Sequence, residues 1–335
     1  MNSLINRIFN ICSASEFDTL TMELFRRQAA GCSPYREYLE LIGCNPTEVS
    51  SIEKIPFLPI RFFKSRRVVT TPPITAAERG KSEEILFTSS STTGMLPSKH
   101  YVSDVEIYRR SFTGGFRLFY GAPEQYAILS LLPGYLERRG SSLIYMADHL
   151  MKLTGNEASG FYLYNYGELA ERLKRLKEQG QKCILIGVTF ALLDFVKEFE
   201  MEFPGLIIVE TGGMKGRGKE ISRKELHKIL CNRFGVEKIH SEYGMAELLS
   251  QAYSKGEGLF LTPPWMKILI RELSDPFSYV NKENIIGGIN IIDLANLNSC
   301  SFIETEDMGR LAYGGFELLG RIKEAERRGC NMLIE

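Results

Sequence analysis

The chain of 335 residues lacks the features that mark several large classes of protein. Lys and Arg together number 41, as do Asp and Glu, so the formal net charge is zero. The basic excess typical of nucleic-acid binding is therefore missing. No CxxC pair occurs among the seven cysteines, which favours reduced thiols over a disulfide framework. The longest apolar run, residues 183–196, is interrupted by Asp194 and is too short to span a bilayer.

Three further absences narrow the class. No GxSxG sequence occurs, which argues against an α/β-hydrolase. Asn6 and Arg7 interrupt the apolar amino terminus, so it lacks the continuous apolar core of a signal peptide. The chain also shows no internal repeat and no low-complexity tract. We expect a cytoplasmic, soluble protein without a nucleic-acid partner or a membrane span.

What the sequence does contain is an alternation of short apolar runs and helical patterns. Strands are predicted at residues 84–88, 126–132, 182–188 and 206–210, and helices at 103–119, 141–153, 189–201 and 222–234. This alternation predicts an α/β architecture with largely parallel pairing. Further strands are predicted at 266–271, 285–294, 301–304 and 316–319. We therefore expect an α/β region over 1–258 with a helical amino terminus, a β-rich subdomain over 259–319, and a short tail over 320–335.

The strongest local signal is a run of small polar residues that ends in a glycine and is followed by Lys99. The run consists of Ser89, Ser90, Ser91, Thr92, Thr93 and Gly94. Between a strand and a helix, its backbone N–H groups and hydroxyls can converge on an anion, and Lys99 adds a point charge suited to a polyphosphate. The alternative is a solvated Ser/Thr loop.

A second candidate phosphate loop is the glycine-rich stretch 213–219, which has the GxxxxGK spacing of a Walker A motif. Glu220 occupies the position where Ser or Thr would hold magnesium. Ser222 and Glu225 form a capping box, which predicts that the helix begins only beyond Lys219. We interpret the stretch as a glycine-rich turn, and a P-loop phosphotransferase stays open as a rival.

Three weaker candidates lie further along the chain. Tyr243 and Gly244 suit stacking on a base and close backbone approach, and Glu247 can bind magnesium, although such turns are common. Asp307, predicted to end a strand, can accept both hydroxyls of a ribose, although a solvated acidic turn is the alternative. Cys330 follows two arginines, which favour its thiolate form, although most free cysteines are structural.

Taken in order, these segments resemble the motifs of the adenylate-forming superfamily of acyl-CoA synthetases and aryl-acid ligases. Residues 88–99 are similar to the Thr-Ser-Gly-Thr-Thr-Gly-x-Pro-Lys phosphate loop, with Ser91 in place of the glycine. Residues 243–247 are similar to Tyr-Gly-x-Thr-Glu, with Ala246 in place of the threonine. Residues 305–307 are similar to Thr-Gly-Asp, and residues 320–323 are similar to the hinge motif.

The resemblance implies the large N-terminal domain of that superfamily, with parallel-rich sheets, helices and a β-rich subdomain. It implies ATP and Mg2+ as cofactors, an adenine site at Gly212, Gly213 and Met214, and a ribose site at Asp307. Arg321 would reach the nucleotide and Lys323 would be the pivot of the hinge. Because the printed chain ends at Glu335, we expect the mobile C-terminal domain of the superfamily to be absent or truncated.

Residues 131–143 and the terminal Arg328-Gly329-Cys330-Asn331 are similar to one branch, the LuxE-type acyl-protein synthetases. This likeness implies activation of a fatty or aromatic acid as an acyl-adenylate. The acyl group would then pass to a thiol, possibly Cys330, for delivery to a reductase or a carrier protein. Two rivals stay open: a ligase that uses coenzyme A or a carrier protein, and a non-catalytic nucleotide-binding subunit. His240 lines the acyl pocket, acts as a base, or is structural.

Overall fold

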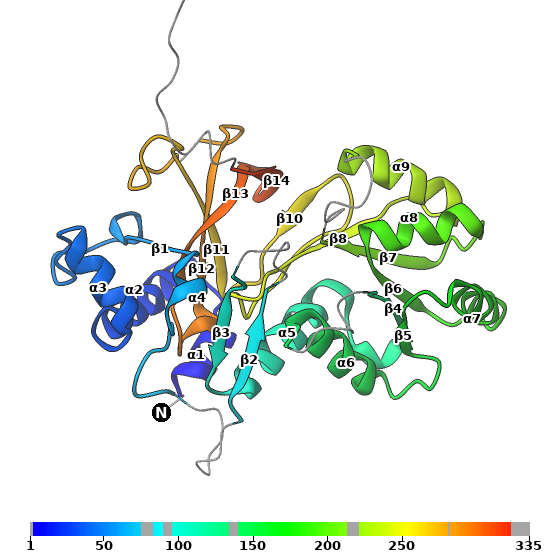
Figure 1. The fold of residues 1–335 in the computed structure, drawn as a ribbon, viewed down its shortest axis with the longest axis horizontal. Coiled ribbons are helices and arrows are strands. Elements are labelled where there is room, and N and C mark those ends of the chain that lie inside the picture. The colour runs from blue at the N-terminus through cyan, green and yellow to red at the C-terminus, as the bar shows by residue number, and fades with distance from the viewer. Residues whose placement is uncertain are drawn as a thin grey trace, which may run out of the picture.

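The computed structural model describes residues 3–74, 83–89, 96–133, 140–212, 221–280 and 282–322. Its strands are β1 (Leu58–Pro59), β2 (Ile85–Thr88), β3 (Lys99–Val102), β4 (Ala127–Leu131), β5 (Gly160–Tyr162), β6 (Cys183–Val188), β7 (Leu206–Thr211), β8 (His240–Tyr243), β9 (Ala252–Ser254), β10 (Leu259–Leu261), β11 (Met266–Arg271), β12 (Gly287–Asp293), β13 (Phe302–Ala312) and β14 (Gly315–Arg321). Its helices are α1 (Leu4–Phe9), α2 (Ala14–Gly31), α3 (Ser33–Leu41), α4 (Phe62–Ser65), α5 (Val105–Tyr120), α6 (Ser142–Thr154), α7 (Tyr166–Glu178), α8 (Thr189–Glu198) and α9 (Arg223–Phe234), with short 3-10 turns η1 (Ile52–Lys54), η2 (Pro123–Gln125) and η3 (Leu294–Asn296). Figure 1 labels these elements where there is room.

Within these ranges one twelve-stranded sheet runs through the molecule. Its order is β5-β4-β6-β7-β8-β9-β10-β14-β13-β12-β11, and β1 pairs with β13. Strands β5, β4, β6, β7 and β8 are parallel to one another, whereas each pair from β8–β9 to β12–β11 is antiparallel. The predicted α/β architecture with a β-rich carboxyl-terminal part is confirmed. The domain boundaries at 258 and 319 stay predictions.

The parallel half forms because its strands are apolar on both faces. Every residue of β4 and β6 is buried, as in parallel sheets that helices cover from both sides. Helices α8 and α9 lie on one face of this half, and α5 and α6 lie on the other (Figure 1). The four strands predicted in this half and in the β2 region match the structure to within one residue at each end.

Local capping signals fix the ends of the helices. The hydroxyl of Ser141 accepts a hydrogen bond from the backbone N–H of Ile144 at the start of α6. Ser222 accepts from the N–H of Glu225 in the same way at the start of α9, which confirms that this helix begins beyond Lys219. Gly155 and Gly235 end the two helices with left-handed φ angles of 60° and 64°, a conformation that glycine adopts without strain.

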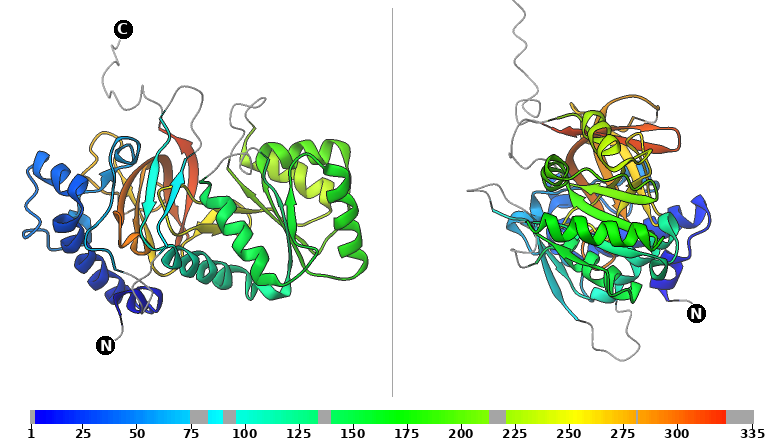
Figure 2. Two further views of the ribbon diagram at one scale, coloured as in Figure 1. Left: turned by 60° about the horizontal axis from the view of Figure 1, so that its bottom comes forward. Right: turned by 90° about the vertical axis from the view of Figure 1, so that its right-hand side faces the viewer.

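The amino-terminal helices pack against the antiparallel half, on its outer side (Figure 2, left). The buried Gln28 side chain of α2 donates to the carbonyl of Asn296 over 3.0 Å and accepts from the N–H of Ser301 over 2.8 Å. The ring of Phe25 packs edge-on against Phe302, with 5.9 Å between the centroids. Strand β1 adds to the same region through its parallel pairing with β13. Segments from the two ends of the chain thus share one core.

Candidate active site

Three strands bring Tyr243, Asp307 and Arg321 together. The Tyr243 hydroxyl donates to Asp307 Oδ2 over 2.8 Å, and Arg321 Nε lies 3.4 Å from Asp307 Oδ1. Burial raises the pKa of Asp307 above its ordinary value, and the Arg321 guanidinium partly offsets that rise. The Arg321 side chain is 81% exposed, so the ion pair lies at the rim of the site. The tyrosine ring, by contrast, is buried.

The segment that carries Asp307 lies inside a strand. The expectation that residues 303–307 end a strand is wrong, because β13 continues to Ala312. Its pairing with β12 is nevertheless irregular here: Gly288 pairs with Met308 and Asn290 with Glu304, so three residues of β13 face one residue of β12. The Thr305 hydroxyl bonds the carbonyl of Ile289 within this bulge. β-Bulges change the direction of side chains next to functional sites, and Asp307 is one of the residues in this bulge.

Glu247 lies four residues beyond the end of β8, and its side chain is buried. Burial raises the pKa of Glu247, and a hydrogen bond with the Ser98 side chain partly offsets that rise. Arg321 and Asp307 are near enough to shift the same pKa in opposite directions. The loop that carries Glu247 is anchored to η3, since the Asn296 side-chain amide donates a hydrogen bond to the Glu247 carbonyl over 2.9 Å. Two buried carboxylates and one guanidinium therefore share this region.

A two-stranded hairpin joins the Ser/Thr-rich loop to this region. The helix predicted at 103–119 is present as α5, and between it and the loop lies a strand that was not predicted, β3, which pairs antiparallel with β2. His100 of β3 is buried and bonds the carbonyl of Ala246 over 2.8 Å. At the base of the loop, the N–H of Ser98 donates to Ser89 Oγ over 2.9 Å. Lys99 pairs with Thr88 across the hairpin and is exposed.

Gly212 stands directly after β7 with a φ of 69°. Its carbonyl accepts a hydrogen bond from the Thr189 hydroxyl over 3.3 Å. Strands β7 and β8 are parallel neighbours, so Gly212 and Gly244 leave the sheet at the same edge. Ligands of open α/β sheets bind at this carboxyl edge, where Gly212 and Tyr243 are both placed.

The remaining predicted site residues lie outside the described residues. They are Ser90, Ser91, Thr92, Thr93 and Gly94 of the Ser/Thr loop, Gly213 and Met214 of the glycine-rich turn, Lys323 of the hinge, and Cys330. The segment that carries the LuxE-type likeness is described in part. Within it, the carbonyl of Gly140 accepts a hydrogen bond from the N–H of Thr88 over 2.8 Å, which places Gly140 beside the Ser/Thr loop.

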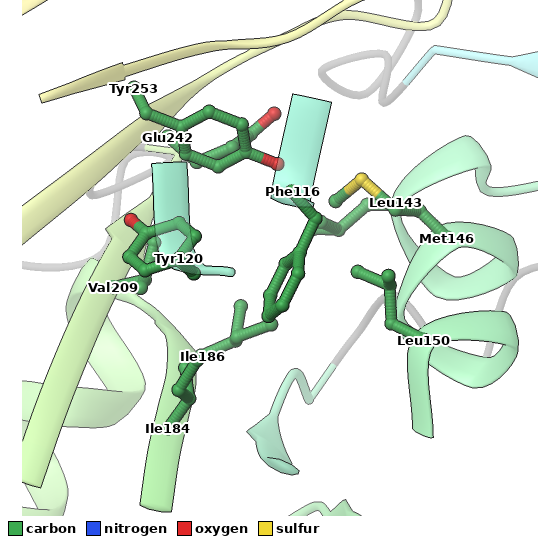
Figure 3. Close-up of a pocket in the computed structure, with 10 residues that line it drawn as sticks. All are labelled: Phe116, Tyr120, Leu143, Met146, Leu150, Ile184, Ile186, Val209, Glu242 and Tyr253. Carbon is green, nitrogen blue, oxygen red and sulfur yellow. The ribbon is translucent and has the colours of Figure 1, made fainter. Parts of the chain in front are cut away.

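A small pocket lies between α5, α6 and the central strands, and Figure 3 shows the side chains around it. Its apolar walls include Phe116, Leu143, Met146, Leu150, Ile184 and Ile186. His240 does not line the pocket but stacks on Tyr120, which does, with 5.7 Å between the ring centroids. Burial lowers the pKa of His240 to about 4, so this imidazole is neutral near pH 7.

Glu242 is the one carboxyl group among the residues that line this pocket. Its Oε2 accepts a hydrogen bond from the Thr211 hydroxyl, and burial raises its pKa to about 7. No sequence motif pointed to Glu242. One signal was available: successive residues of a strand point to opposite faces, so Glu242 must point away from the side on which Tyr243 meets Asp307.

Among the described residues, no group of three or more His, Cys, Asp or Glu side chains is arranged to hold a metal ion. Glu247 and Ser98 offer oxygen ligands, which magnesium prefers, and magnesium usually keeps several waters and takes few protein ligands. The residues present therefore fit a magnesium ion that is held mainly by a bound polyphosphate. None of the helices in the described ranges is long and apolar enough to cross a membrane.

Comparison with known proteins gives matches among solved structures. No protein-family model and no curated protein matches the sequence. An open conformation of 2-hydroxyisobutyryl-CoA ligase, in complex with 2-HIB-AMP and CoA, matches with a TM-score of 0.65 at 11% identity, over 93% of this chain and 71% of the ligase. McyG A-PCP, complexed with phenylalanyl-adenylate, matches with a TM-score of 0.52 at 17% identity, over 75% of this chain and 48% of that one. The chain therefore has the fold of the large domain of adenylate-forming ligases.

Proposed function

We propose that this chain activates a carboxylic acid with ATP as an acyl-adenylate. The observation that carries the proposal is the meeting of Tyr243, Asp307 and Arg321 from three different strands, with Glu247 next to them. These are the positions that the sequence assigns to adenine, ribose, the nucleotide and magnesium. The two structures compared above, which share the fold, hold an acyl- or aminoacyl-adenylate.

In this proposal each group has one task. Asp307 accepts the ribose hydroxyls, and the exposed Arg321 moves aside to free an oxygen of that carboxylate. Tyr243 stacks on the adenine, whose other side faces Gly212. A carboxylate oxygen of the acid attacks the α-phosphorus, the bond between that phosphorus and its bridging oxygen breaks, and pyrophosphate leaves with the electron pair. Hydroxyls of the Ser/Thr loop and Lys99 hold the leaving phosphates.

Magnesium would be held by Glu247 together with the phosphates of ATP, and it would neutralise charge on the leaving pyrophosphate. The raised pKa of Glu247 reflects burial without a full counter-charge, and a bound cation would supply one. The Ser98 hydroxyl, which bonds the Glu247 side chain here, orients that carboxylate.

We further propose that the activated acyl group is apolar and passes to a thiol, with Cys330 as the candidate acceptor. The side chains around the small pocket beside β8 are mostly apolar. Transfer to coenzyme A or to a carrier protein is the alternative for the second step. A nucleotide-binding subunit without catalysis is the alternative for the first.

The first step is tested by acid-dependent exchange of labelled pyrophosphate into ATP. We expect exchange by the full chain with magnesium and a pool of carboxylic acids, loss of exchange in Asp307→Asn and Glu247→Gln, and no change in the exposed control Glu237→Gln. ATP binding without exchange would establish the non-catalytic alternative. Intact mass spectrometry of Cys330→Ser beside the parent chain then tests the acceptor, because only the parent should gain a hydroxylamine-labile acyl mass.

A further inference from the structure

Strand β3 and the residue before it present two buried polar side chains to the loop that carries Glu247. Alternate residues of a strand point to the same face, and Ser98 and His100 are 2% and 1% exposed, whereas Lys99 between them is exposed. The Ser98 side chain shares a hydrogen bond with the Glu247 side chain. The Nδ1 atom of His100 lies 2.8 Å from the carbonyl oxygen of Ala246. Two neighbouring positions on one face of the strand therefore bind two consecutive residues of the loop.

The hydrogen bonds of His100 are compatible with one arrangement of its protons. A carbonyl oxygen only accepts, so Nδ1 carries the hydrogen and donates it to Ala246. Nε2 is then an acceptor, and the Ser299 hydroxyl donates to it over 3.0 Å. Burial lowers the pKa of this imidazole to about 4, so the ring is neutral near pH 7. Both ring nitrogens are engaged within the protein, which leaves the ring a structural contact to the loop and no position for proton transfer to a substrate.

The same loop is anchored to two other elements. The Asn296 amide of η3 donates to the Glu247 carbonyl over 2.9 Å. Asp293, at the end of β12, accepts from the N–H groups of Leu249 and Ser250 over 2.8 and 2.9 Å. These contacts join the loop to the antiparallel half of the large sheet, whereas the imidazole and the neighbouring serine join it to the hairpin of β2 and β3. The hairpin contacts are thus the ones that can set the distance between the loop and the hairpin.

The start of β3 also closes the base of the Ser/Thr loop. The Ser98 N–H donates to Ser89 Oγ over 2.9 Å, and the Ser89 N–H donates to the Ser98 carbonyl over 3.1 Å. The start of β3 therefore lies between the loop assigned to the phosphates and the carboxylate assigned to magnesium. Magnesium binds with near-ideal octahedral geometry and short metal–oxygen distances. An ion bound to both the phosphates and the carboxylate requires a defined separation between the two.

From this arrangement we propose that His100 is a positioning residue, which holds Glu247, through the Ala246 carbonyl, at the separation from the Ser/Thr loop that a magnesium–polyphosphate complex requires. The inference rests on the proposed function, because that function assigns magnesium to Glu247 and the phosphates to the loop. Without the Nδ1–H bond, the Ala246 carbonyl is a buried acceptor without its partner, and the peptide that leads into Glu247 can turn. The contribution of the metal to nucleotide binding is then lost, whereas the contacts of Tyr243 and Asp307 with the nucleoside are kept.

The test measures binding of α,β-methylene-ATP, which cannot release pyrophosphate, to the full chain by calorimetry. Each protein is titrated once with Mg2+ and once with EDTA in its place, and the ratio of the two dissociation constants gives the tightening by the metal. His100→Gln should reduce the tightening seen in the parent by about tenfold or more, as the loss of groups that orient metal ligands does, and should leave the dissociation constant in EDTA unchanged. His100→Asn should keep the tightening, because asparagine, like histidine, has a nitrogen bonded to Cγ, whereas the amide of glutamine lies one carbon further out.

Tyr35→Phe is the matched control, since it also removes one hydrogen bond from a buried side chain to a backbone carbonyl, that of Pro56. It lies in the amino-terminal layer and should behave as the parent. A tightening that His100→Gln keeps or His100→Asn loses would overturn the inference, and so would a parent chain that Mg2+ does not help. Urea unfolding verifies that each variant folds, and if His100→Gln does not, the result for His100→Asn decides.

Acid-dependent pyrophosphate exchange by the parent separates this inference from the proposed function. Loss of the tightening in His100→Gln, in a parent chain that shows no exchange with any acid, would support the inference and overturn the proposed function. Exchange by the parent together with an unchanged tightening in His100→Gln would do the reverse.

Discussion

Replacing Glu242 by Gln should stabilise the protein relative to the parent, and this gain in unfolding free energy should be larger at pH 8 than at pH 5. Burial raises the pKa of Glu242 from 4.5 to about 7, so the folded state holds this proton more tightly than the unfolded state does. The stability that the neutral carboxyl contributes is therefore complete below about pH 4.5 and is lost as the pH rises through about 7. Glutamine keeps an oxygen that can accept from Thr211 and carries no charge at any pH.

The magnitude follows from the shift. One pKa unit corresponds to about 1.4 kcal/mol, so ionising this half-buried group costs about 2 to 3 kcal/mol over the interval from pH 5 to pH 8. The difference in unfolding free energy between Glu242→Gln and the parent should rise by about that amount across the interval. Urea unfolding at both pH values measures it, with the fluorescence of Trp265, the one tryptophan of the chain and a buried one, as the probe. An equal difference at both pH values would refute the reasoning, and Glu237→Gln should show no such change.

Three further substitutions test other parts of the structure. Asp307→Asn should raise the KM for ATP by about 10- to 100-fold, because a charge-assisted hydrogen bond is lost, and an unchanged KM would exclude Asp307 from the ribose site. Asp293→Ala should destabilise the fold by about 3 to 5 kcal/mol in urea unfolding, because it leaves several buried donors without an acceptor, and each unpaired donor is costly. The buried Asp293 accepts hydrogen bonds from the N–H groups of Leu249, Ser250 and Ala295 and from the Ser250 hydroxyl. A loss below about 1 kcal/mol would contradict this prediction. Gly244→Ala should destabilise the fold by no more than about 1 kcal/mol in urea unfolding, because the added Cβ meets the carboxylate end of the Glu242 side chain, which can shift. A loss above about 2 kcal/mol would contradict this.

The parts of the fold that the sequence predicts best are those that local chemistry determines. Strand β6 is a continuous apolar run and β7 begins with one, and α9 has its cap at Ser222 and its terminating glycine at Gly235. Such signals act over a few neighbouring residues and do not depend on the rest of the chain. The predicted helices and strands of the parallel half therefore agree closely with the structure.

Strand β3 was not predicted because its structure depends on distant partners. It has four residues, and its place is fixed by pairing with β2 and by the contact of His100 with Ala246, which lies 146 residues further along the chain. The bulge at Asp307 has the same origin, since it arises from the pairing of β13 with β12. Neither feature leaves a periodic pattern in the sequence.

The residues of the candidate site divide in the same way, into those that belong to a local sequence motif and those that do not. The motifs indicated Tyr243, Asp307, Arg321 and Glu247, and the structure brings these residues together. Glu242 has no motif, because its environment is created by α5, α6 and β7 and not by its neighbours in sequence. A charged residue inside a four-residue strand gives no sign of which helices will cover it.

The parallel pairing of β1 with β13 has a consequence for the order in which the parts of the chain fold. Leu58 lies beside Ile303, and Gln28 of α2 meets Asn296 and Ser301, so partners of the first helices lie near the other end of the sequence. During synthesis, the amino-terminal helices can bury their apolar faces only after the ribosome has made most of the polypeptide, because their partners lie near residues 296–303. Closing so long a loop carries an entropic cost before any contact forms. The parallel half, whose strands are close in sequence, can assemble earlier, and the amino-terminal segment is then added as the last layer.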